Sequence, residues 1–394
     1  MCVTSVRNII LLGLTSLLAD FSSEMVVPIL PFFIQAVGGG GIAIGLIFGV
    51  GDAVAALLKV FSGYWADRTR KYKLFVFGGY LFSAAAKFLY PFANSWSQVS
   101  AIRPIERMGK GFRDAPRDAI VSESVPHERR GWGFGVQRAM DSVGALAGSV
   151  FVFVLFLYLD FPFQKIFFVS ALVALLAVIP IFFVKVPAEL RLNHRKKVSF
   201  EKLSSEAKRF IMIATLFAFS NFSVAFFVLK AQLSFTDLSQ RQALAIALVV
   251  YIIFNIFDAG FSRPAGALSD RVGRKKIIFT SYLIFSAVSL GFLVLSLNSP
   301  ALPVSFIILA GLFAMYGLFK AFVDASQRAF ISDLSEVEIR GTALGTFETF
   351  TGLAAIPAGL IAGALWNVNP VYTFTYGLGL SLIAAIVLLV ATSK

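Results

Sequence analysis

Long apolar runs alternate with short polar connectors along the whole chain. Twelve runs reach the length of roughly 20 mostly apolar residues that a helix needs to cross a bilayer. Their period and length predict an all-α integral membrane protein with twelve transmembrane helices. The predicted spans are 7–36, 42–63, 74–94, 98–121, 132–157, 164–185, 208–233, 242–265, 277–297, 303–331, 341–365 and 371–392.

Composition supports this prediction. Of the 394 residues, 58% are hydrophobic and only 14% are charged, whereas an ordinary soluble domain has about 25% charged residues. The mean hydropathy is +0.81. A soluble protein with this composition lacks the polar residues to cover its surface, so soluble classes are excluded.

The net charge of +13 follows from membrane topology. Basic residues concentrate in the connectors 64–73, 122–131, 186–207 and 266–276, whereas the alternate connectors hold only Lys165 and Arg241. Cytoplasmic loops carry such an excess of Lys and Arg. We therefore expect a multi-pass protein of the cell membrane with both termini in the cytoplasm, the lipid bilayer as a partner and no nucleic-acid partner.

Several kinds of chemistry lack the residues they need. Cys2 is the single cysteine, and the two histidines, His127 and His194, fall in predicted loops. A disulfide is therefore impossible within the chain, and a His/Cys metal site is not expected. No GxxxxGK[ST] phosphate loop occurs. We expect no metal, no cofactor and no enzymatic activity.

The two halves of the chain are copies of each other. The segment KGFRDAPRDAIVSESVPHERRGWGFG (110–135) aligns without a gap with KAFVDASQRAFISDLSEVEIRGTALG (320–345) at an offset of 210. The match at equal topology predicts two six-helix bundles related by pseudo-twofold symmetry along the membrane normal, with substrate sites between such repeats. The expected division is an N-terminal bundle (1–185), a basic linker (186–207) and a C-terminal bundle (208–394).

Four motifs give the chain a resemblance to the major facilitator superfamily over essentially its whole length. GYWADRTRKYK (63–73) and its second copy GALSDRVGRKK (266–276) resemble the family's loop between helices two and three, except that Arg70 and Lys71 replace a glycine-arginine pair. RPIERMG (103–109) resembles the arginine motif of proton-coupled members, and GALAG (144–148) the glycine motif of antiporters.

The resemblance implies a secondary active transporter that works by alternating access of two bundles. It favours proton-coupled efflux, or antiport, of a small organic solute by a monomeric protein. The alternative is proton-coupled uptake, or symport, of an anionic solute such as an organic acid or a phosphate ester. A non-transporting membrane sensor is a minor alternative.

The fourth span carries a charged stripe, with Arg103, Arg107, Lys110, Asp114 and Arg117 at spacings of 4, 3, 4 and 3. This spacing places them on one helical face. We interpret the lower part as a cytoplasmic gate paired with Arg138 and Asp141 of the next span, while Arg103 and Arg107 suit a cavity or a gate equally. The resemblance adds Asp67 and Asp270 as latches. The predicted gate residues are Gly63, Asp67, Arg68, Lys110, Asp114, Arg117, Asp141, Gly266, Asp270, Arg271, Lys320 and Asp324.

The first span contains two acids, Asp20 and Glu24, one helical turn apart and followed by Pro28 and Pro31. The second half has Asn221 in place of Asp20. Burial and a like charge favour a protonated acid, whereas a nearby arginine favours the carboxylate, so such a group is suited to proton exchange. The alternative is a fixed salt bridge to Arg103 or Arg107. The predicted coupling residues are Asp20, Glu24 and Asp52, and the predicted substrate cavity contains Asp20, Glu24, Arg103, Arg107, Arg138 and Asn221.

Overall fold

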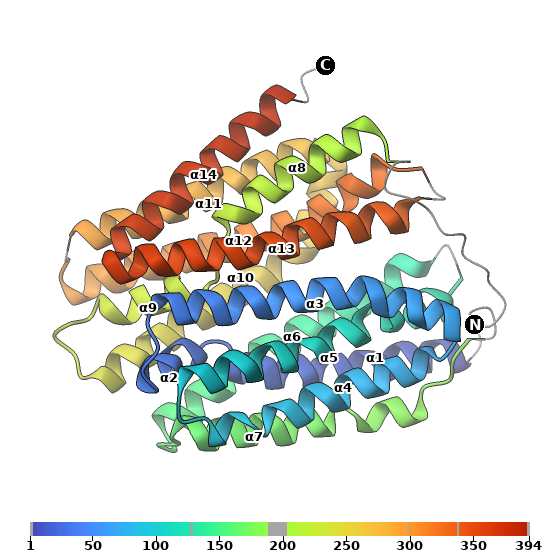
Figure 1. Ribbon diagram of the computed structural model, residues 1–394, viewed down its shortest axis with the longest axis horizontal. Coiled ribbons are helices and arrows are strands. Elements are labelled where there is room, and N and C mark those ends of the chain that lie inside the picture. The colour runs from blue at the N-terminus through green and yellow to red at the C-terminus, as the bar shows by residue number, and fades with distance from the viewer. Residues whose placement is uncertain (1–2, 127–128, 188–202, 299, 337–338, 392–394) are drawn as a thin grey trace. The chain divides into compact units, whose positions relative to one another are not determined.

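The computed structural model describes residues 3–126, 129–187, 203–298, 300–336 and 339–391. Within these ranges every regular element is a helix, which confirms the all-α prediction (Figure 1). Most of the predicted linker 186–207 lies outside the described residues, as do Cys2, His127 and His194.

The helices follow the predicted spans closely. The first half contains α1 (Val3–Val26), α2 (Leu30–Ala36), α3 (Gly41–Thr69), α4 (Tyr72–Lys87), η1 (Tyr90–Phe92), α5 (Trp96–Glu123), α6 (Arg130–Leu157), α7 (Phe163–Leu176) and η3 (Ile179–Phe183). The second half contains α8 (Ser205–Ser220), α9 (Ala225–Leu233), α10 (Gln240–Val272), α11 (Arg274–Leu297), α12 (Leu302–Asp333), α13 (Arg340–Val368) and α14 (Pro370–Ala391).

Eleven helical segments of the described chain are long and apolar enough to cross a membrane. The predicted span 98–121 is not among them, although α5 covers it with 28 residues. Nine charged residues lower the hydropathy of α5 below that of its neighbours. Such charges are tolerated in a membrane when they face the bundle interior and pair with one another, and α5 forms the site described below.

The chain divides into two compact units. Unit 1 comprises residues 1–33 and 51–197, and unit 2 comprises 34–50 and 198–394. The boundary after residue 197 falls inside the predicted linker. The start of α3 belongs to unit 2 because it packs on α13 at backbone distance, where any side chain larger than hydrogen at Gly45 would meet Gly359. The simpler division into 1–185 and 208–394 stays a prediction.

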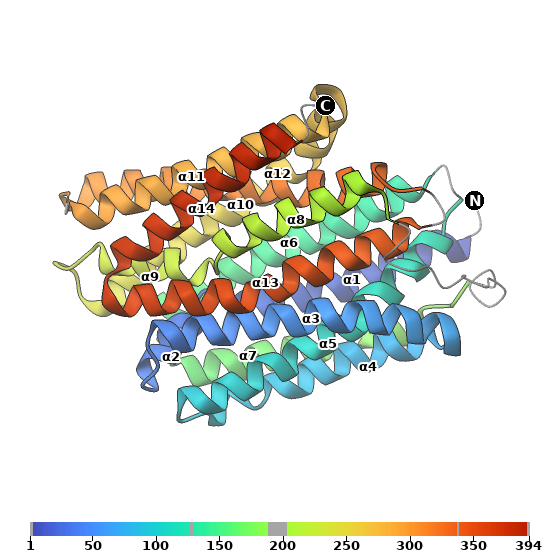
Figure 2. The same cartoon turned by 45° about the horizontal axis from the view of Figure 1, so that its top comes forward.

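Unit 1 is built around two helix pairs, α1 with α6 and α4 with α5, and α7 packs on α1 and α4 (Figures 1 and 2). Glycines bring α6 against α1, because a Cβ atom at Gly144 or Gly148 would lie 2.2 Å from the carbonyl oxygen of Leu17 or Phe21, respectively. These are the glycines of the GALAG motif. Their contact fixes the turn of α1 that carries Asp20.

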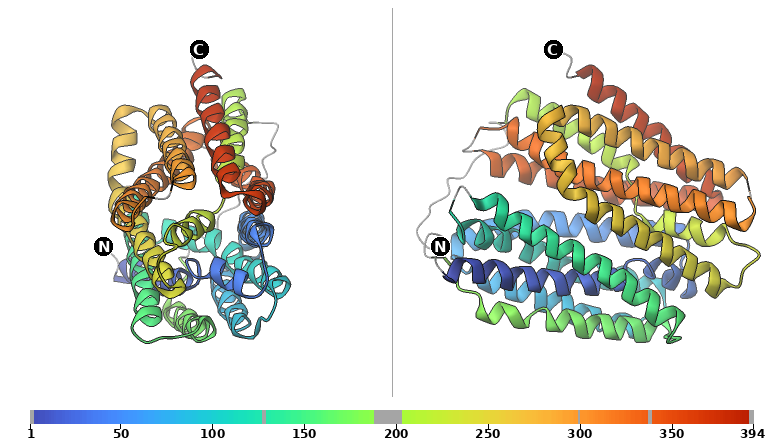
Figure 3. Two further views of the ribbon diagram at one scale, coloured as in Figure 1. Left: turned by 90° about the vertical axis from the view of Figure 1, so that its left-hand side faces the viewer. Right: turned by 180° about the vertical axis from the view of Figure 1, so that it is seen from behind.

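Unit 2 has a core of aromatic rings between α9, α11, α12 and α14, the helices whose ribbons run from yellow to red in Figure 3. Phe227 illustrates it, with ring centroids 4.8 Å from Phe292, 5.0 Å from Tyr316 and 5.7 Å from Phe374. Helix α12 lies beside α10 and α11. Tilted and offset rings at these separations pack favourably.

Both units interrupt their first span. In unit 1, α1 ends at Val26, and α2 begins only at Leu30, after a turn that contains Pro28. Proline lacks the N–H that would continue the helix, which explains this break. The corresponding span of unit 2 breaks between Ser220 and Ala225 without a proline, and Asn221 caps the end of α8 there.

Candidate functional site, a buried charged cluster in unit 1

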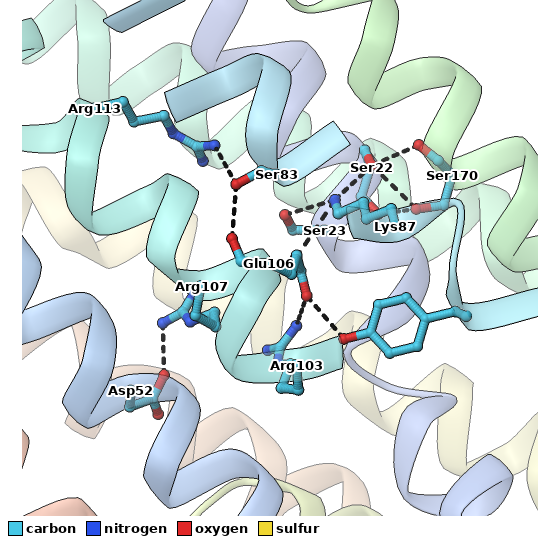
Figure 4. Close-up of polar contacts among 11 residues, drawn as sticks. Ser22, Ser23, Asp52, Ser83, Lys87, Arg103, Glu106, Arg107, Arg113 and Ser170 are labelled. Atoms are coloured by element: carbon cyan, nitrogen blue, oxygen red, sulfur yellow. Dashed lines mark hydrogen bonds and ion pairs between the residues drawn. The ribbon is translucent and has the colours of Figure 1, made fainter. Parts of the chain in front are cut away.

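A cluster of charged side chains lies among α1, α4, α5 and α7 (Figure 4). Lys87 is 2% exposed, and Arg103 and Glu106 are each 4% exposed. An unpaired charge at the centre of a membrane helix costs about 2.5–3.5 kcal/mol to insert. These residues are therefore tolerated only because each has partners.

Glu106 of α5 is held by two hydrogen-bond donors and a third cation. The guanidinium of Arg103 lies 2.7 Å from Oε2, and the hydroxyl of Tyr90 donates to the same oxygen at 3.0 Å. The ammonium of Lys87 lies 3.9 Å from Oε1. Opposite charges and donated hydrogen bonds stabilise a carboxylate, and these contacts hold the carboxyl group of Glu106 at the centre of the cluster.

Lys87 joins this anion to the first helix. Its Nζ donates to Ser22 Oγ at 2.6 Å and to Ser23 Oγ at 3.1 Å, both in α1. Ser22 in turn donates to the carbonyl oxygen of Ser170 in α7 at 2.7 Å. One ammonium group thus links α4, α1 and, through a serine, α7.

Close helix packing brings the rest of the cluster together. A Cβ atom at Gly109 would lie 2.4 Å from Gly79 O, so α4 and α5 touch at their backbones. Ser83 Oγ can therefore donate to the carbonyl oxygen of Glu106 at 2.8 Å, and Arg113 donates to Ser83 Oγ at 3.3 Å. The Arg113 guanidinium also lies 4.0 Å from the centroid of the Tyr80 ring.

A small cavity of about 10 Å³ lies beside this network. That volume corresponds to about one water molecule. Cations outnumber acids on its walls, and an organic solute does not fit into it. The lining residues are Ala19, Ser23, Tyr80, Ser83, Lys87, Glu106, Arg107, Lys110, Arg113 and Ala174.

Asp20, the first predicted coupling residue, lies near this cluster but is held differently. Within the described residues its carboxyl group has no hydrogen bond or ion pair. The charged groups that act on it are Asp141 of α6 and three cations of α5, Lys110, Arg113 and Arg117. Asp20 therefore has a like-charged group of α6 and three cations of α5 acting on it, whereas the sequence pointed to Arg103 or Arg107 as its cation.

The remaining predicted coupling and cavity residues are partly brought together. Asp52 forms an ion pair of 2.6 Å with Arg107, and half of its side chain is exposed. Arg107 reaches Asp52 from the neighbouring helix because α3 and α5 pack closely at Gly51 and Gly111.

Glu24 in α1 and Arg138 in α6 are both engaged in polar interactions. Asn221 belongs to unit 2, where it ends α8.

The predicted gate stripe on α5 has polar partners in α1 and in α5 itself. Arg117 donates to Ser16 Oγ of α1 at 2.9 Å and lies 2.9 Å from Asp118, while Asp114 lies 3.9 Å from Arg117. Helix α1 lies near the stripe because it packs against both α5 and α6. The pairing of the stripe with Arg138 and Asp141 of α6 stays a prediction.

The other predicted gate residues lie at the ends of helices. Asp67 accepts a hydrogen bond of 2.7 Å from the hydroxyl of Tyr72, while Asp270 pairs with Arg274 at 3.1 Å. Lys320 and Asp324 pair within α12 at 3.0 Å. Arg68 and Arg271 are exposed. Gly63 faces Ala115 of α5, whereas Gly266 has open space around it.

Sequence reasoning missed Lys87, Tyr90, Glu106 and Arg113. Glu106 lies inside the quoted RPIERMG motif, three residues after Arg103, which is the spacing of a helical ion pair. Lys87 is a lone cation deep in the predicted span 74–94. An ionisable residue inside a span indicates a functional site by default, and that rule identifies Lys87.

Comparisons with known proteins now give the family. The model of the Major Facilitator Superfamily matches residues 12–257 and 210–394. The chain belongs to this superfamily. It is a multi-pass membrane transporter for small-molecule substrates and not an enzyme.

Individual relatives cover most of the chain. It is 44% identical over 386 residues to an uncharacterised MFS-type transporter of Methanocaldococcus jannaschii, covering 97% of this chain and 94% of the relative. It is 23% identical over 303 residues to the multidrug resistance protein MdtG of Escherichia coli, covering 72% of this chain and 71% of that protein. The solved structure of the nucleoside transporter NupG has a TM-score of 0.78 at 15% identity, covering 98% and 99% of the two chains.

Proposed function

We propose that this protein is a proton-coupled antiporter that exports a small organic solute. The main support for this proposal is Asp20, whose carboxyl group has no hydrogen bond or ion pair in the described chain. The charged groups that act on it are Asp141 and three cations. Glu106, in contrast, accepts hydrogen bonds from Arg103 and Tyr90 and has the ammonium of Lys87 nearby. A group that takes up and releases protons must be stable in both states, so Asp20 is the proposed proton carrier and Glu106 a fixed anion.

Export is supported by two observations. The glycines of the antiporter-like motif, Gly144 and Gly148, contact α1 on either side of Asp20. Relatives from Escherichia coli and Serratia proteamaculans are named multidrug resistance proteins, although they are distant.

The excess of cations around the small cavity favours an anionic group on a solute that binds beside it. Lys87, Arg107, Lys110 and Arg113 line it, with Glu106 as the acid among its lining residues. An inside-negative potential favours outward movement of an anion by about 2.3 kcal/mol per charge per 100 mV, and it favours inward movement of a proton equally. The same cationic lining also suits the second candidate, proton-coupled uptake of an anion, in which the proton offsets that electrical cost.

Transport in proteoliposomes distinguishes the two directions. A solute is first identified by its thermal stabilisation of the purified protein, because a ligand of the folded state raises the unfolding temperature. An antiporter accumulates this solute when the vesicle interior is acidic, since protons leave as the solute enters. A symporter accumulates it when the exterior is acidic.

Asp20→Asn tests the proposed proton carrier in the same vesicles. We expect it to abolish accumulation under either gradient while it keeps solute exchange between equal pools. Asp237→Asn, which removes an exposed acid from a connector, is the matched control and should transport normally. Gradient-driven accumulation by Asp20→Asn at the wild-type rate would contradict the proposal.

A further inference from the structure

A second pocket of about 400 Å³ lies on unit 1, away from the charged cluster. It is formed by the turn between α3 and α4, the first two turns of α4, and the end of η3. Of its seven lining residues three are basic and four are apolar. They are Arg70, Lys71, Lys73, Leu74, Phe77, Phe182 and Val186.

The apolar part of this pocket is open at the surface of the unit. Leu74 and Phe182 are each 60% exposed, and the ring of Phe182 packs edge-on against Phe77 with centroids 5.1 Å apart. In a membrane-spanning protein such side chains face hydrocarbon. The pocket therefore joins an apolar wall to a cationic rim at a helix end.

Lys73 has a structural role in this arrangement. Its ammonium donates to the carbonyl oxygens of Phe182 and Val184 at 2.8 and 2.9 Å, where η3 ends. These bonds satisfy carbonyls that a helix leaves free at its C-terminus. They also hold the end of η3 against α4, which keeps the pocket in shape and leaves Arg70 and Lys71 as its less constrained cations.

Arg70 is held in an unusual backbone conformation. Its φ is 58°, and its N–H donates to Ala66 O at 2.7 Å. The second copy of this loop makes the same bond, from Gly273 to Ser269, and there a glycine has the positive φ of 104°. A residue with a Cβ atom is strained in this region, so a glycine would fit better for the fold alone. An arginine at this position suggests a use for its side chain.

We propose that this pocket binds one anionic phospholipid. The phosphate diester of the headgroup pairs with Arg70 and Lys71, and a hydrocarbon chain lies on Leu74, Phe77 and Phe182. Basic pockets between transmembrane helices at the cytoplasmic face bind such headgroups, and the distribution of Lys and Arg predicts that this end of α4 is cytoplasmic. Charge complementarity favours lipid over the chain's own linker, because the residues 190–197 that follow the pocket are themselves strongly basic.

Native mass spectrometry of the full-length protein in detergent tests this site. The probes are phosphatidylglycerol, zwitterionic phosphatidylcholine, and glycerol phosphate as a chain-free phosphate ester. We expect one tightly bound phosphatidylglycerol per protein, weaker binding of phosphatidylcholine, and no displacement by glycerol phosphate. Displacement by glycerol phosphate would identify a phosphate-ester site and overturn the lipid assignment.

Arg70→Gly separates lipid binding from folding. It removes the cation and restores the residue that unit 2 has at this place, so the unfolding temperature should stay equal or rise. Binding of phosphatidylglycerol should weaken about fivefold, as expected for one basic residue near an anionic lipid. Lys276→Ala is the matched control, since it removes an exposed cation from the first turn of α11, next to the second copy of the loop. Equal weakening by both variants would mean diffuse attraction and would overturn the site.

Leu74→Trp tests the shape of the pocket without changing its charge. The larger ring fills the apolar wall, so we expect the bound phosphatidylglycerol to be lost while the protein stays folded. Wild-type binding by this variant would contradict a built pocket.

Discussion

The same buried helix face carries charges in unit 1 and aromatic rings in unit 2. Nine of the ten buried positions of α5 have a buried counterpart 210 residues later in α12, and only Ile120 lacks one. At these matched positions Phe313 is the counterpart of Arg103, and Tyr316 is the counterpart of Glu106. Packing geometry was kept in both copies while the chemistry diverged.

The neighbouring helices repeat this difference. Seven of the eight buried positions of α4 match buried positions of α11 at an offset of 202. Ser289 is the counterpart of Lys87, and Phe285 is the counterpart of Ser83. A polar network inside a membrane is stable only when every member has its partner, and the matched positions of Lys87, Arg103 and Glu106 all lack a charge in unit 2. We infer that unit 1 carries the ionic chemistry and unit 2 acts as its packed counterpart.

The largest expected effect comes from moving the acid between the copies. In the double variant Asp20→Asn/Asn221→Asp the chain keeps its acid, but in a unit whose matched helix face is aromatic. We expect proton-driven transport in proteoliposomes to fall by at least about a hundredfold, which is the usual contribution of a positioned proton-transfer group. Recovery of transport would show that the two units are interchangeable in coupling.

A second test concerns the matched positions of Lys87 and Ser289. Lys87→Met leaves the buried Glu106 with fewer partners, and breaking a buried pair in this way costs about 3–5 kcal/mol. Ser289→Ala removes a hydroxyl from a buried apolar setting and should cost less than about 1.5 kcal/mol. The midpoints of thermal unfolding in detergent measure both.

Lys87→Met/Glu106→Gln serves as the control for this test, because it removes both charges. If charge balance and not shape stabilises the cluster, the double variant should unfold at a higher temperature than Lys87→Met alone. An equal or additive loss would show that unit 1 depends on these side chains for packing alone.

The sequence was sufficient to predict the fold. Hydrophobic run lengths and the internal repeat identified each span, because a bilayer fixes the length of a helix and a duplicated sequence repeats its burial pattern. Even the least apolar helix, α5, was included, since its charges recur with a helical period. The break near Pro28 was also foreseeable, because proline cannot donate its N–H to the helix.

The site was only partly predictable. Spacing placed Arg103, Arg107 and Lys110 on one face of α5, but their partners depend on which helices lie beside it. Arg107 pairs with Asp52 and Arg103 with Glu106, contacts that helix packing at glycines decides. Lys87 was overlooked because it stands alone in its span, and the serines that hold it come from another helix.

A third test uses the glycines at the contact of α1 with α6. In unit 2 the matched residues are alanines, with Ala358 in the place of Gly148, and Ala358 is fully buried. Gly148→Ala pushes a methyl group into the backbone of α1 and should cost about 1–3 kcal/mol. Ala358→Gly should cost about 1 kcal/mol through helix propensity. Gly135→Ala, with open space around it, is the control and should be neutral or stabilising. A neutral Gly148→Ala would show that α1 and α6 separate easily.

The smallest expected effect concerns the two copies of the loop aspartate. Asp67 is partly buried and accepts a hydrogen bond from Tyr72, whereas the side chain of Asp270 is 62% exposed and shares Arg274 with Asp333. An asparagine at 67 still accepts the bond but loses the charge, so Asp67→Asn should lower stability by about 1 kcal/mol. Asp270→Asn should lower it by less than about 0.5 kcal/mol, because an exposed pair is weak and Asp333 retains the arginine. The midpoints of thermal unfolding show which of the two variants loses more stability. The control is Asp270→Asn/Asp333→Asn, which removes both acids that pair with Arg274. If Asp270→Asn lowers stability more than Asp67→Asn, the ion pair of Asp270 contributes more than the hydrogen bond of Asp67. The stronger charged contacts of unit 1 would then be confined to its buried helices and would not include the loop.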